Sequence, residues 1–511
     1  MNFFLLLAVL GIFLAITIYR FESGILFFIF SIPLYHIVAI FLGQSRFLTI
    51  LFMFLGIFIG AIINMARKRQ MLIDWEWEIS KPILVFTIIM TLSYIFVVLR
   101  IYDILSFYPH LFRDYILNVD LKTTGDALNL ANYQYLNYFT SFMLLFIALR
   151  LDITRKFLSR LFYTLFASAS IVFIGAIYQF FIDPYFMGQA TGIGEQGWIA
   201  ENTFANRFGS TLIDPNSLGI YSIIMLLVFI GFLLYCKKKH KKILASIGIF
   251  MTVILLLFSG SRTGFFAVAL LILYYIFHWI SIGIRKAFIK SKVGIISNRK
   301  VMALTSAFFI IVIVLAAAAI ILLFLKLDET LLPVTLKRVQ IDIQNLFSGD
   351  YRTAVNDLLG GRRQLWQAAF FAIREHPVDG VGIGMITIEL PNYGDFFGIL
   401  GLPRDMADNY YIQVTAEMGI FALGINLWIF WIVLKSYGTY ISKILSTRLK
   451  DFAFHLYMIV PLMLAMFLFG PHTYFMEVSL LFYFIIGIFL NLRSRSIVDE
   501  EIHIEKIKEN I

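Results

Sequence analysis

Two polar segments of the chain carry arginines in positions suited to binding an anion. Arg262 stands in the polar break 259–264 between two apolar runs, and Arg362 and Arg363 lie at the expected start of a helix in a long polar segment. A guanidinium group stays charged and offers a planar fork of donors that matches phosphate oxygens, and the free N–H groups of a helix start also favour anions. These arginines indicate a clamp for a diphosphate. The alternatives are a turn arginine that reaches the lipid headgroups and ordinary surface charge.

Asp408 stands just before an apolar run that begins with Tyr410. A carboxylate in this place, facing the long polar segment, can take a proton from an attacking hydroxyl as a general base. The alternative is a helix N-cap, which accepts from backbone N–H groups. Glu417 falls about two to three turns deeper in the same run, where charges are rare and tend to be functional. A buried polar contact to another helix is an equal alternative for Glu417.

Further side chains are expected to complete the site around these groups. We expect the substrate to contact Arg363, Arg207, Trp366, Glu417 and His472. His472 lies in an outward-facing turn, and Arg207 ends a glycine-rich polar segment. The outward histidines have no second ligand at metal spacing, and the single cysteine, Cys236, has no thiol partner. We therefore expect neither a metal site nor a cofactor.

The composition requires that most of the elements holding these residues lie in a membrane. Hydrophobic residues make up 60% of the chain and charged residues 14%, whereas a soluble domain has about 45–50% and about 25%. Apolar runs of about 20 residues predict an all-α polytopic membrane protein with about 12–13 transmembrane helices. They are expected at 3–19, 24–42, 47–66, 82–102, 135–149, 161–182, 212–235, 243–258, 264–284, 301–325, 409–434, 453–470 and 474–492.

Lysine and arginine gather in alternate connections between the predicted spans, for example at 67–69 and 435–450. Because short cytoplasmic loops carry an excess of these residues, we assign this side and the C-terminus to the cytoplasm. The segments 103–134, 183–211 and 326–408 then face outward. The net charge of +10 is spread over short loops, which indicates contact with anionic membrane lipid and excludes nucleic acid as a partner.

The longest outward segment, 326–408, is expected to be a large and partly helical extracytoplasmic loop. Apolar residues at helical spacing predict an amphipathic helix at 331–347, and a second helix is expected between Gly361 and Pro377. A turn at 379–384 follows, in which glycines permit positive φ angles. The loop and its flanking spans together form the expected functional core.

The chain is expected to divide into three parts. Residues 1–200 form N-terminal transmembrane helices, residues 201–435 the core with its loop, and residues 436–511 C-terminal helices with a cytoplasmic tail. The apolar segments show no repeat of inverted or parallel type. This weighs against a transporter, because many transporters are built from such repeats.

Four motifs in a fixed order resemble the O-antigen ligase and O-antigen polymerase-like family. They cover about residues 200–430, and Asp214-Pro215-Asn216 also fits the pattern. In this chain the motifs are Phe258-Ser259-Gly260-Ser261-Arg262-Thr263-Gly264, Gly361-Arg362-Arg363-Gln364-Leu365-Trp366, His376-Pro377 with Gly380-Val381-Gly382-Ile383-Gly384, and Asp408-Asn409-Tyr410-Tyr411-Ile412 with Glu417-Met418-Gly419-Ile420. Their order around a large outward loop is more specific than any one motif.

The resemblance implies a metal-independent, inverting glycosyltransferase of GT-C-like architecture that acts on a glycan linked to undecaprenyl diphosphate. It implies that Arg262 and Arg362 hold the diphosphate and stabilise the charge that develops as the glycosidic bond breaks. Asp408 stands where the ligases of the family have a histidine that activates the acceptor hydroxyl. An aspartate can remove the same proton, and the departure favours a polymerase that extends O antigen, capsule, exopolysaccharide or a teichuronic acid-like polymer.

Two alternatives stay open at this point. One is a ligase that transfers the finished glycan to a lipid A-core or another acceptor. The other is a transporter of lipid-linked oligosaccharides, which predicts several ionisable groups in mid-span, where the chain has mainly Glu417 and Glu477. For the enzyme we expect a location in the bacterial inner membrane, an extracytoplasmic active face, and a flippase and a chain-length regulator as partners.

Overall fold

The protein is a multi-pass helical membrane protein, as its composition predicts. The computed structural model describes residues 3–75, 77–101, 121–183, 185–187, 207–290, 362–396, 398–399, 402, 405–440 and 447–492. In these ranges the regular elements are all helices, and eight of them are long and apolar enough to cross a membrane. Shorter apolar stretches of helix accompany them, at Phe3–Tyr19, at Arg262–Ile276 in the first part of a longer helix, and at Met476–Asn491.

The described helices fall into a transmembrane bundle and two helices of the long loop. The bundle contains α1 (Phe3–Tyr19), α2 (Phe21–Ser31), α3 (Tyr35–Leu42), α4 (Arg46–Arg67), α5 (Ser80–Ile101), α7 (Leu121–Leu149), α8 (Arg155–Phe181), α10 (Pro215–Tyr235), α11 (Lys239–Ser259), α12 (Arg262–Lys290), α18 (Tyr410–Tyr440), α19 (Thr447–Met466) and α20 (Met476–Asn491). Short 3-10 turns connect some of them, namely η1 (Ile32–Leu34), η3 (Ser210–Leu212), η6 (Phe467–Phe469) and η7 (His472–Tyr474). The loop helices are α16 (Arg362–Glu375) and α17 (Ile386–Phe396).

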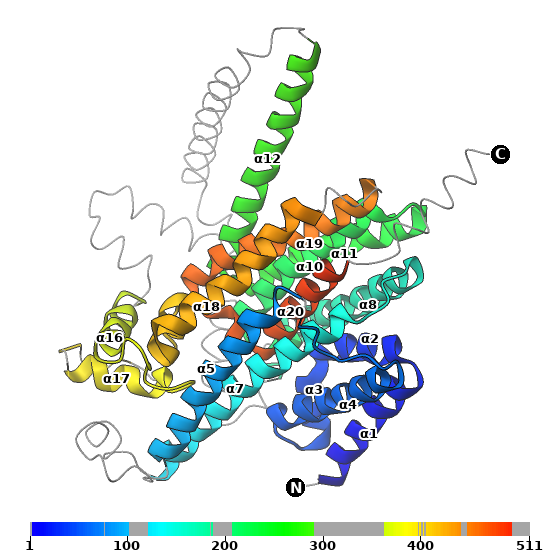
Figure 1. The fold of residues 1–511 in the computed structure, drawn as a ribbon. Helices are drawn as coiled ribbons and strands as arrows, with labels where there is room; N and C mark the ends of the chain where they lie inside the picture. Colours follow the sequence, from blue (N-terminus) through cyan, green and yellow to red (C-terminus); the bar gives the residue numbers. More distant parts are fainter. Residues whose placement is uncertain are drawn as a thin grey trace.

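Helices α10 and α20 lie in the centre of the bundle (Figure 1). Every residue of α20 is buried, and α10 is buried on all sides over most of its length. Helix α10 packs against α11 and α19, and α20 packs against α7. A helix that is apolar all round is stable only when other elements surround it, so these two sequences determine which helices form the core.

The N-terminal helices α1 to α4 form a group at one side of the bundle (Figure 1). Helix α1 packs closely along α4, where a Cβ atom at Gly56 would lie 2.7 Å from the Leu10 carbonyl oxygen. Small residues permit this approach of two backbones within a membrane. Pro33 lies in η1 and divides the predicted span 24–42 into α2 and α3.

Every predicted span except 301–325 coincides with helix in the structure. The span 301–325 and the amphipathic helix predicted at 331–347 lie outside the described residues. The span predicted at 135–149 is the second half of α7, which already begins at Leu121. Residues 121–134 of the segment predicted to face outward are therefore helix continuous with this span, and 102–120 lie outside the described residues.

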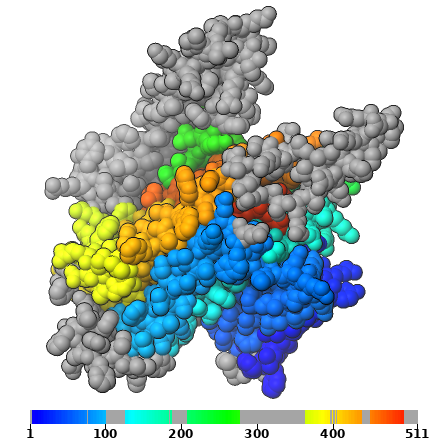
Figure 2. Space-filling model, in the orientation of Figure 1, coloured from blue at the N-terminus to red at the C-terminus, as the bar shows by residue number. Residues whose placement is uncertain are grey.

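The second helix predicted in the long loop is confirmed as α16, which ends at Glu375, two residues before Pro377. Helix α17 was not predicted, because Pro391 lies inside it and proline is unfavourable in a helix interior. Both helices lie beside the beginning of α18, and Figure 2 shows them in yellow against orange α18. The glycine-rich turn between them is confirmed by positive φ angles at Gly380, Gly382 and Gly384.

Candidate active site

The start of α18 presents Asp408 to the long loop. The backbone N–H groups of Tyr411 and Ile412 donate to Asn409 Oδ1 at 3.0 and 3.1 Å, so Asn409 is the N-cap of this helix. The alternative in which Asp408 caps the helix is therefore wrong. Asp408 has a φ angle of 50°, in the left-handed region that residues other than glycine seldom adopt. The Asp408 carboxylate does not cap the helix and makes a different contact.

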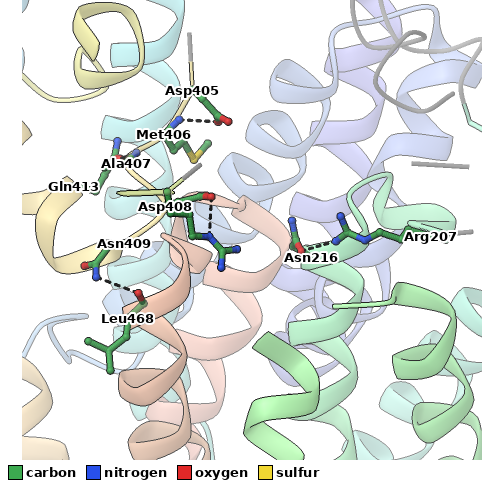
Figure 3. A network of polar contacts seen from close by, with 10 residues as sticks. Arg207, Asn216, Asp405, Met406, Ala407, Asp408, Asn409, Gln413 and Leu468 are labelled. Carbon is green, nitrogen blue, oxygen red and sulfur yellow. Dashed lines mark hydrogen bonds and ion pairs between the residues drawn. The ribbon is translucent and has the colours of Figure 1, made fainter. Parts of the chain in front are cut away.

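That contact is an ion pair with Arg362, the first residue of α16. Arg362 Nε donates to Asp408 Oδ2 at 3.0 Å, and the two side chains are 20% and 35% exposed (Figure 3). Within the part of the chain that the structure describes, the two Nη groups of Arg362 donate no hydrogen bond. The contact through Nε thus fixes the orientation of the Arg362 guanidinium group. The N–H donors of its two Nη atoms are then suited to the oxygens of an anion.

The turn that follows α16 holds this helix against α18. Helix α18 is broken at Gly419, where φ is 80°. The N–H groups of Val381 and Gly382 donate to the carbonyl oxygens of Ala416 and Glu417 at 2.8 and 2.9 Å, which satisfies backbone acceptors that the break leaves open. A Cβ atom at residue 419 would lie 1.8 Å from a carbonyl oxygen of this segment, so glycine is required there. The motif glycines therefore position Arg362 opposite Asp408.

A buried ion pair between α17 and α5 supports the same loop. The Arg100 and Glu389 side chains are 7% and 2% exposed, with 3.6 Å between Arg100 Nη2 and Glu389 Oε1. Burial raises the pKa of Glu389, and the Arg100 charge opposes this effect. The Ile383 N–H donates to Ser93 Oγ of α5 at 2.9 Å. Sequence reasoning missed this anchor, although an arginine at the end of an apolar run was an available signal.

Glu417 lies inside the bundle with both carboxylate oxygens engaged. It is 0% exposed, Gln413 Nε2 donates to its Oε1 at 2.7 Å, and the Tyr474 hydroxyl donates to its Oε2. Gln413 Oε1 in turn accepts from the Ala407 N–H at 2.7 Å. This is the buried polar contact that the sequence left open as an alternative. The network fixes the backbone just before Asp408.

His472 lies close to the ion pair and is 3% exposed. Its Nε2 atom is buried and has no hydrogen-bond partner among the described residues. Burial, together with the nearby Arg362 charge, lowers the pKa of His472 to about 3, so the imidazole is neutral near pH 7. The Asn409 side chain donates to the Leu468 carbonyl oxygen at 3.1 Å, which ties the turn before His472 to α18.

The start of α10 brings Arg207 to the same end of the bundle. Asp214 Oδ1 accepts from the N–H groups of Asn216 and Ser217, which confirms the predicted capped start. Arg207 Nη2 donates to Asn216 Oδ1 at 2.7 Å (Figure 3). Burial raises the pKa of Asp214 to about 6; Arg207 opposes this shift and Asp408 adds to it. The carboxylates of Asp214 and Asp408 are therefore within electrostatic reach of each other.

Arg262 enters this region through the turn between α11 and α12. The turn packs on α10, because a Cβ atom at Gly219 would lie 2.5 Å from Ser261 Cβ. Arg207 Nε donates to the Ser259 carbonyl oxygen of the same turn at 3.4 Å. Arg262 is half-buried as the first residue of α12. The structure thus places the turn that carries Arg262 in contact with Arg207, and places Arg362 beside Asp408 and His472.

The two remaining predicted substrate contacts lie in the first turns of α16. Arg363 is exposed, and Trp366 is partly buried against the apolar cluster between α16 and α18. The Trp366 indole N–H has no hydrogen-bond partner in the described ranges. Both side chains therefore belong to the first turns of α16, the helix that begins with Arg362.

The arrangement can move a proton and stabilise a negative charge. A carboxylate can accept a proton from a hydroxyl, and a preorganised guanidinium group can stabilise charge on a leaving oxygen. Among the described residues, no group of three or more His, Cys, Asp and Glu side chains has a geometry suited to a metal ion. The two reactive groups come from the loop and the bundle, respectively.

The described residues form a multi-pass helical bundle, and the loop helices pack beside the start of α18, where a carboxylate meets a guanidinium group. Residues 247–427 match the family model described as O-Antigen ligase. These residues therefore form an O-antigen ligase domain, and the match implies a polysaccharide-processing membrane enzyme that transfers glycan from a lipid-linked substrate. The match includes Arg262, Arg362 and Asp408. A search of curated proteins found no match.

Proposed function

We propose that the protein polymerises repeat units linked to undecaprenyl diphosphate into a surface polysaccharide, such as O antigen, capsule, exopolysaccharide or a teichuronic acid-like polymer. The observation that carries the proposal is the ion pair of Arg362 with Asp408, because it combines a base and an anion-binding group in one site. The enzyme works in the bacterial inner membrane with its active face outside and its C-terminus in the cytoplasm. A flippase supplies the repeat units, and a chain-length regulator limits the product.

In the proposed reaction Asp408 accepts the proton of an acceptor hydroxyl, and the hydroxyl oxygen attacks C1 of the donor sugar. The new C–O bond forms on one face of the sugar as the C1–O bond to the diphosphate breaks on the other, so the configuration at C1 inverts. The leaving undecaprenyl diphosphate keeps the electron pair. Arg362 and Arg262, with Arg207 beside them, stabilise its negative charge. In this scheme the guanidinium groups provide the positive charge that a metal ion supplies elsewhere.

The aspartate at position 408 favours a polymerase over a ligase, because the ligases that this chain resembles have a histidine there. A ligase is the second candidate, since the matching family model is described as O-Antigen ligase. A deletion strain distinguishes the two reactions. Loss of a polymerase leaves single repeat units on the final acceptor, whereas loss of a ligase leaves long chains on the carrier lipid.

Variants of the arginines test the proposed reaction itself. Arg362→Ala and Arg262→Ala should each abolish long chains while the protein still inserts into the membrane. Arg374→Ala is the matched control, because this arginine lies at the other end of α16 and its side chain is 70% exposed. Full-length polymer from both Arg362→Ala and Arg262→Ala would contradict the proposed diphosphate site. Movement of labelled lipid-linked oligosaccharide across vesicles without any change in glycan length would favour a transporter instead.

A further inference from the structure

A cavity of about 550 Å³ lies between the N-terminal helices and the starts of α10 and α20. Its volume is within the range of about 300–1,000 Å³ that is typical of small-molecule sites. Asp214 lines the cavity, and so does Met406, two residues before Asp408. Met406 alone among the lining residues falls inside the range 247–427. The family match therefore assigns no role to this cavity.

Two lining residues carry buried polar atoms that have no partner in the described part of the chain. His36 is 5% exposed, and both of its ring nitrogens lack a hydrogen bond. The side-chain oxygen and nitrogen of Gln44 are also buried and unpaired. Because buried polar groups are nearly always hydrogen-bonded, these atoms indicate that something polar binds here. Both groups combine donors and acceptors in a plane.

The rest of the lining combines hydroxyl groups and aromatic rings. The Tyr35 hydroxyl donates to Glu477 Oε2 at 3.2 Å, and the Tyr133 hydroxyl accepts from the Met476 N–H at 3.2 Å. The Phe47 and Tyr133 rings lie 5.8 Å apart between centroids. Aromatic rings present apolar faces beside polar edges. Planar hydrogen-bonding groups beside such faces suit a sugar ring, which has hydroxyls on its rim and C–H groups on its faces.

The charges around the cavity disfavour an anionic ligand. Arg46 lies within electrostatic reach of His36 and Tyr133, but Asp214 and Glu477 also line the wall. A phosphate group would therefore meet two acidic groups beside one guanidinium group, and like charges at short range repel. The lining thus fits uncharged hydroxyl-rich groups better than it fits a diphosphate.

We propose that this cavity is the acceptor subsite of the enzyme and holds the terminal sugars of the glycan that is being extended. The inference rests on the proposed function. A general base has to lie within hydrogen-bond reach of the hydroxyl that it deprotonates, and the cavity borders the segment that carries Asp408. The Arg362 side of the same carboxylate then receives the donor diphosphate. The acceptor glycan then reaches Asp408 from the cavity, and the donor glycan reaches it from the side of Arg362.

The substitution His36→Leu separates a binding role from a structural one. Replacing an unpaired buried polar group by an apolar group of similar shape costs the fold little or stabilises it. If His36 binds sugar, the variant should need about tenfold more substrate for half-maximal rate, the equivalent of about one hydrogen bond, at nearly unchanged maximal rate. A structural role predicts no change in either value.

Ser45→Trp blocks the cavity from its rim without removing a contact. Ser45 lines the cavity and is the N-cap of α4, but its side chain makes no capping hydrogen bond. The matched control is Phe41→Trp, since Phe41 is 84% exposed and lies outside the cavity lining. We expect Ser45→Trp to lose polymer formation and Phe41→Trp to keep it.

The experiment uses the full-length protein in lipid nanodiscs with two probes. One probe is the undecaprenyl-diphosphate-linked repeat unit extracted from the deletion strain, and the other is undecaprenyl diphosphate without sugar. Ser45→Trp and His36→Leu should weaken productive use of the first probe and bind the second probe as the wild type does.

Wild-type kinetics in both variants would overturn the acceptor subsite and leave the proposed function intact. The acceptor subsite would also be overturned if Ser45→Trp weakened binding of the sugar-free carrier as much as it weakened use of the first probe. A wild-type protein that forms no product contradicts the proposed function instead.

Discussion

Two carboxylates near the start of α18 illustrate two different uses of the same chemical group. Glu417, inside the bundle, is 0% exposed and both of its oxygens accept hydrogen bonds. Asp408, at the helix start, is 35% exposed, and its ion-pair partner among the described residues, Arg362, belongs to the loop. A fully paired buried group stabilises one conformation. A partly exposed group stays accessible to an incoming hydroxyl, so the comparison supports a structural role for Glu417 and the proposed catalytic role for Asp408.

The largest expected effect follows from removing the base. Asp408→Asn should lower the polymerisation rate by about 10²–10⁴-fold, the usual contribution of a general base. The fold should be kept, because Asn409 and not Asp408 caps α18. The measurement is the rate of product formation by purified protein, with the thermal midpoint measured on the same samples. A rate close to that of the wild type would show that the base lies elsewhere.

The guanidinium group comes next in expected effect. Arg362→Lys keeps the charge but loses the planar fork of donors, and should slow the reaction by about 10²–10³-fold, as removal of an oxyanion donor does. Arg374→Lys, on the exposed end of the same helix, is the control and should react as the wild type does. An equally active Arg362→Lys variant would mean that a point charge is sufficient.

For Glu417 the comparison predicts the opposite pattern. In Glu417→Gln the amide oxygen can still accept from Gln413 Nε2, and the amide N–H can donate to the Tyr474 hydroxyl oxygen, but both bonds lose the charge of the carboxylate, which should cost about 1–3 kcal/mol of stability. The rate per folded molecule should stay within about threefold of the wild type. Thermal unfolding and product analysis on the same preparation separate the two effects. Glu375→Gln on the exposed end of α16 should change neither value. A stable but inactive Glu417→Gln enzyme would give Glu417 a catalytic role.

The smallest effect concerns Asp214 at the start of α10. Its pKa in the folded protein is about 6, above the ordinary value of 3.8, so the folded state binds the proton more tightly than the unfolded state. Stability from this group is therefore present below about pH 4 and is lost as the pH rises to about 6. Asp214→Asn keeps the cap and should flatten this dependence. Thermal midpoints between pH 4 and pH 7 test it, and identical slopes in both proteins would contradict the raised pKa.

The sequence predicted the spans well because each depends on a local property, about 20 consecutive apolar residues. It predicted α16 and the glycine-rich turn for a similar reason, since helix ends and positive φ angles have local signals. Helix α17 was not predicted; it contains Pro391, and proline is unfavourable in a helix interior. Its buried ion pair with α5 joins distant segments; Arg100 at the end of an apolar run was a local signal for a buried charge, but nothing local indicated that Glu389 is its partner.

The residues of the candidate site were predicted from their types and from the resemblance, but the individual contacts between them were not. Asp408 and Asn409 are equally good helix caps by type, so local rules could not choose between them. The choice depends on Arg362, 46 residues away in sequence, which pairs with Asp408 and leaves the cap to its neighbour. For the same reason nothing in the sequence joined His36 and Gln44 to the start of α20, because the cavity forms only when distant helices pack together.

The most direct test of the account is a double-mutant cycle with Asp408→Asn, Arg362→Ala and the combined variant, assayed for product formation from the lipid-linked repeat unit. If the two side chains act as one unit, the combined variant should be about as slow as the slower single variant, because effects within a catalytic unit are not additive. If the losses of the two single variants multiply in the combined variant, the side chains act independently, and the central claim that they share one reaction site is contradicted.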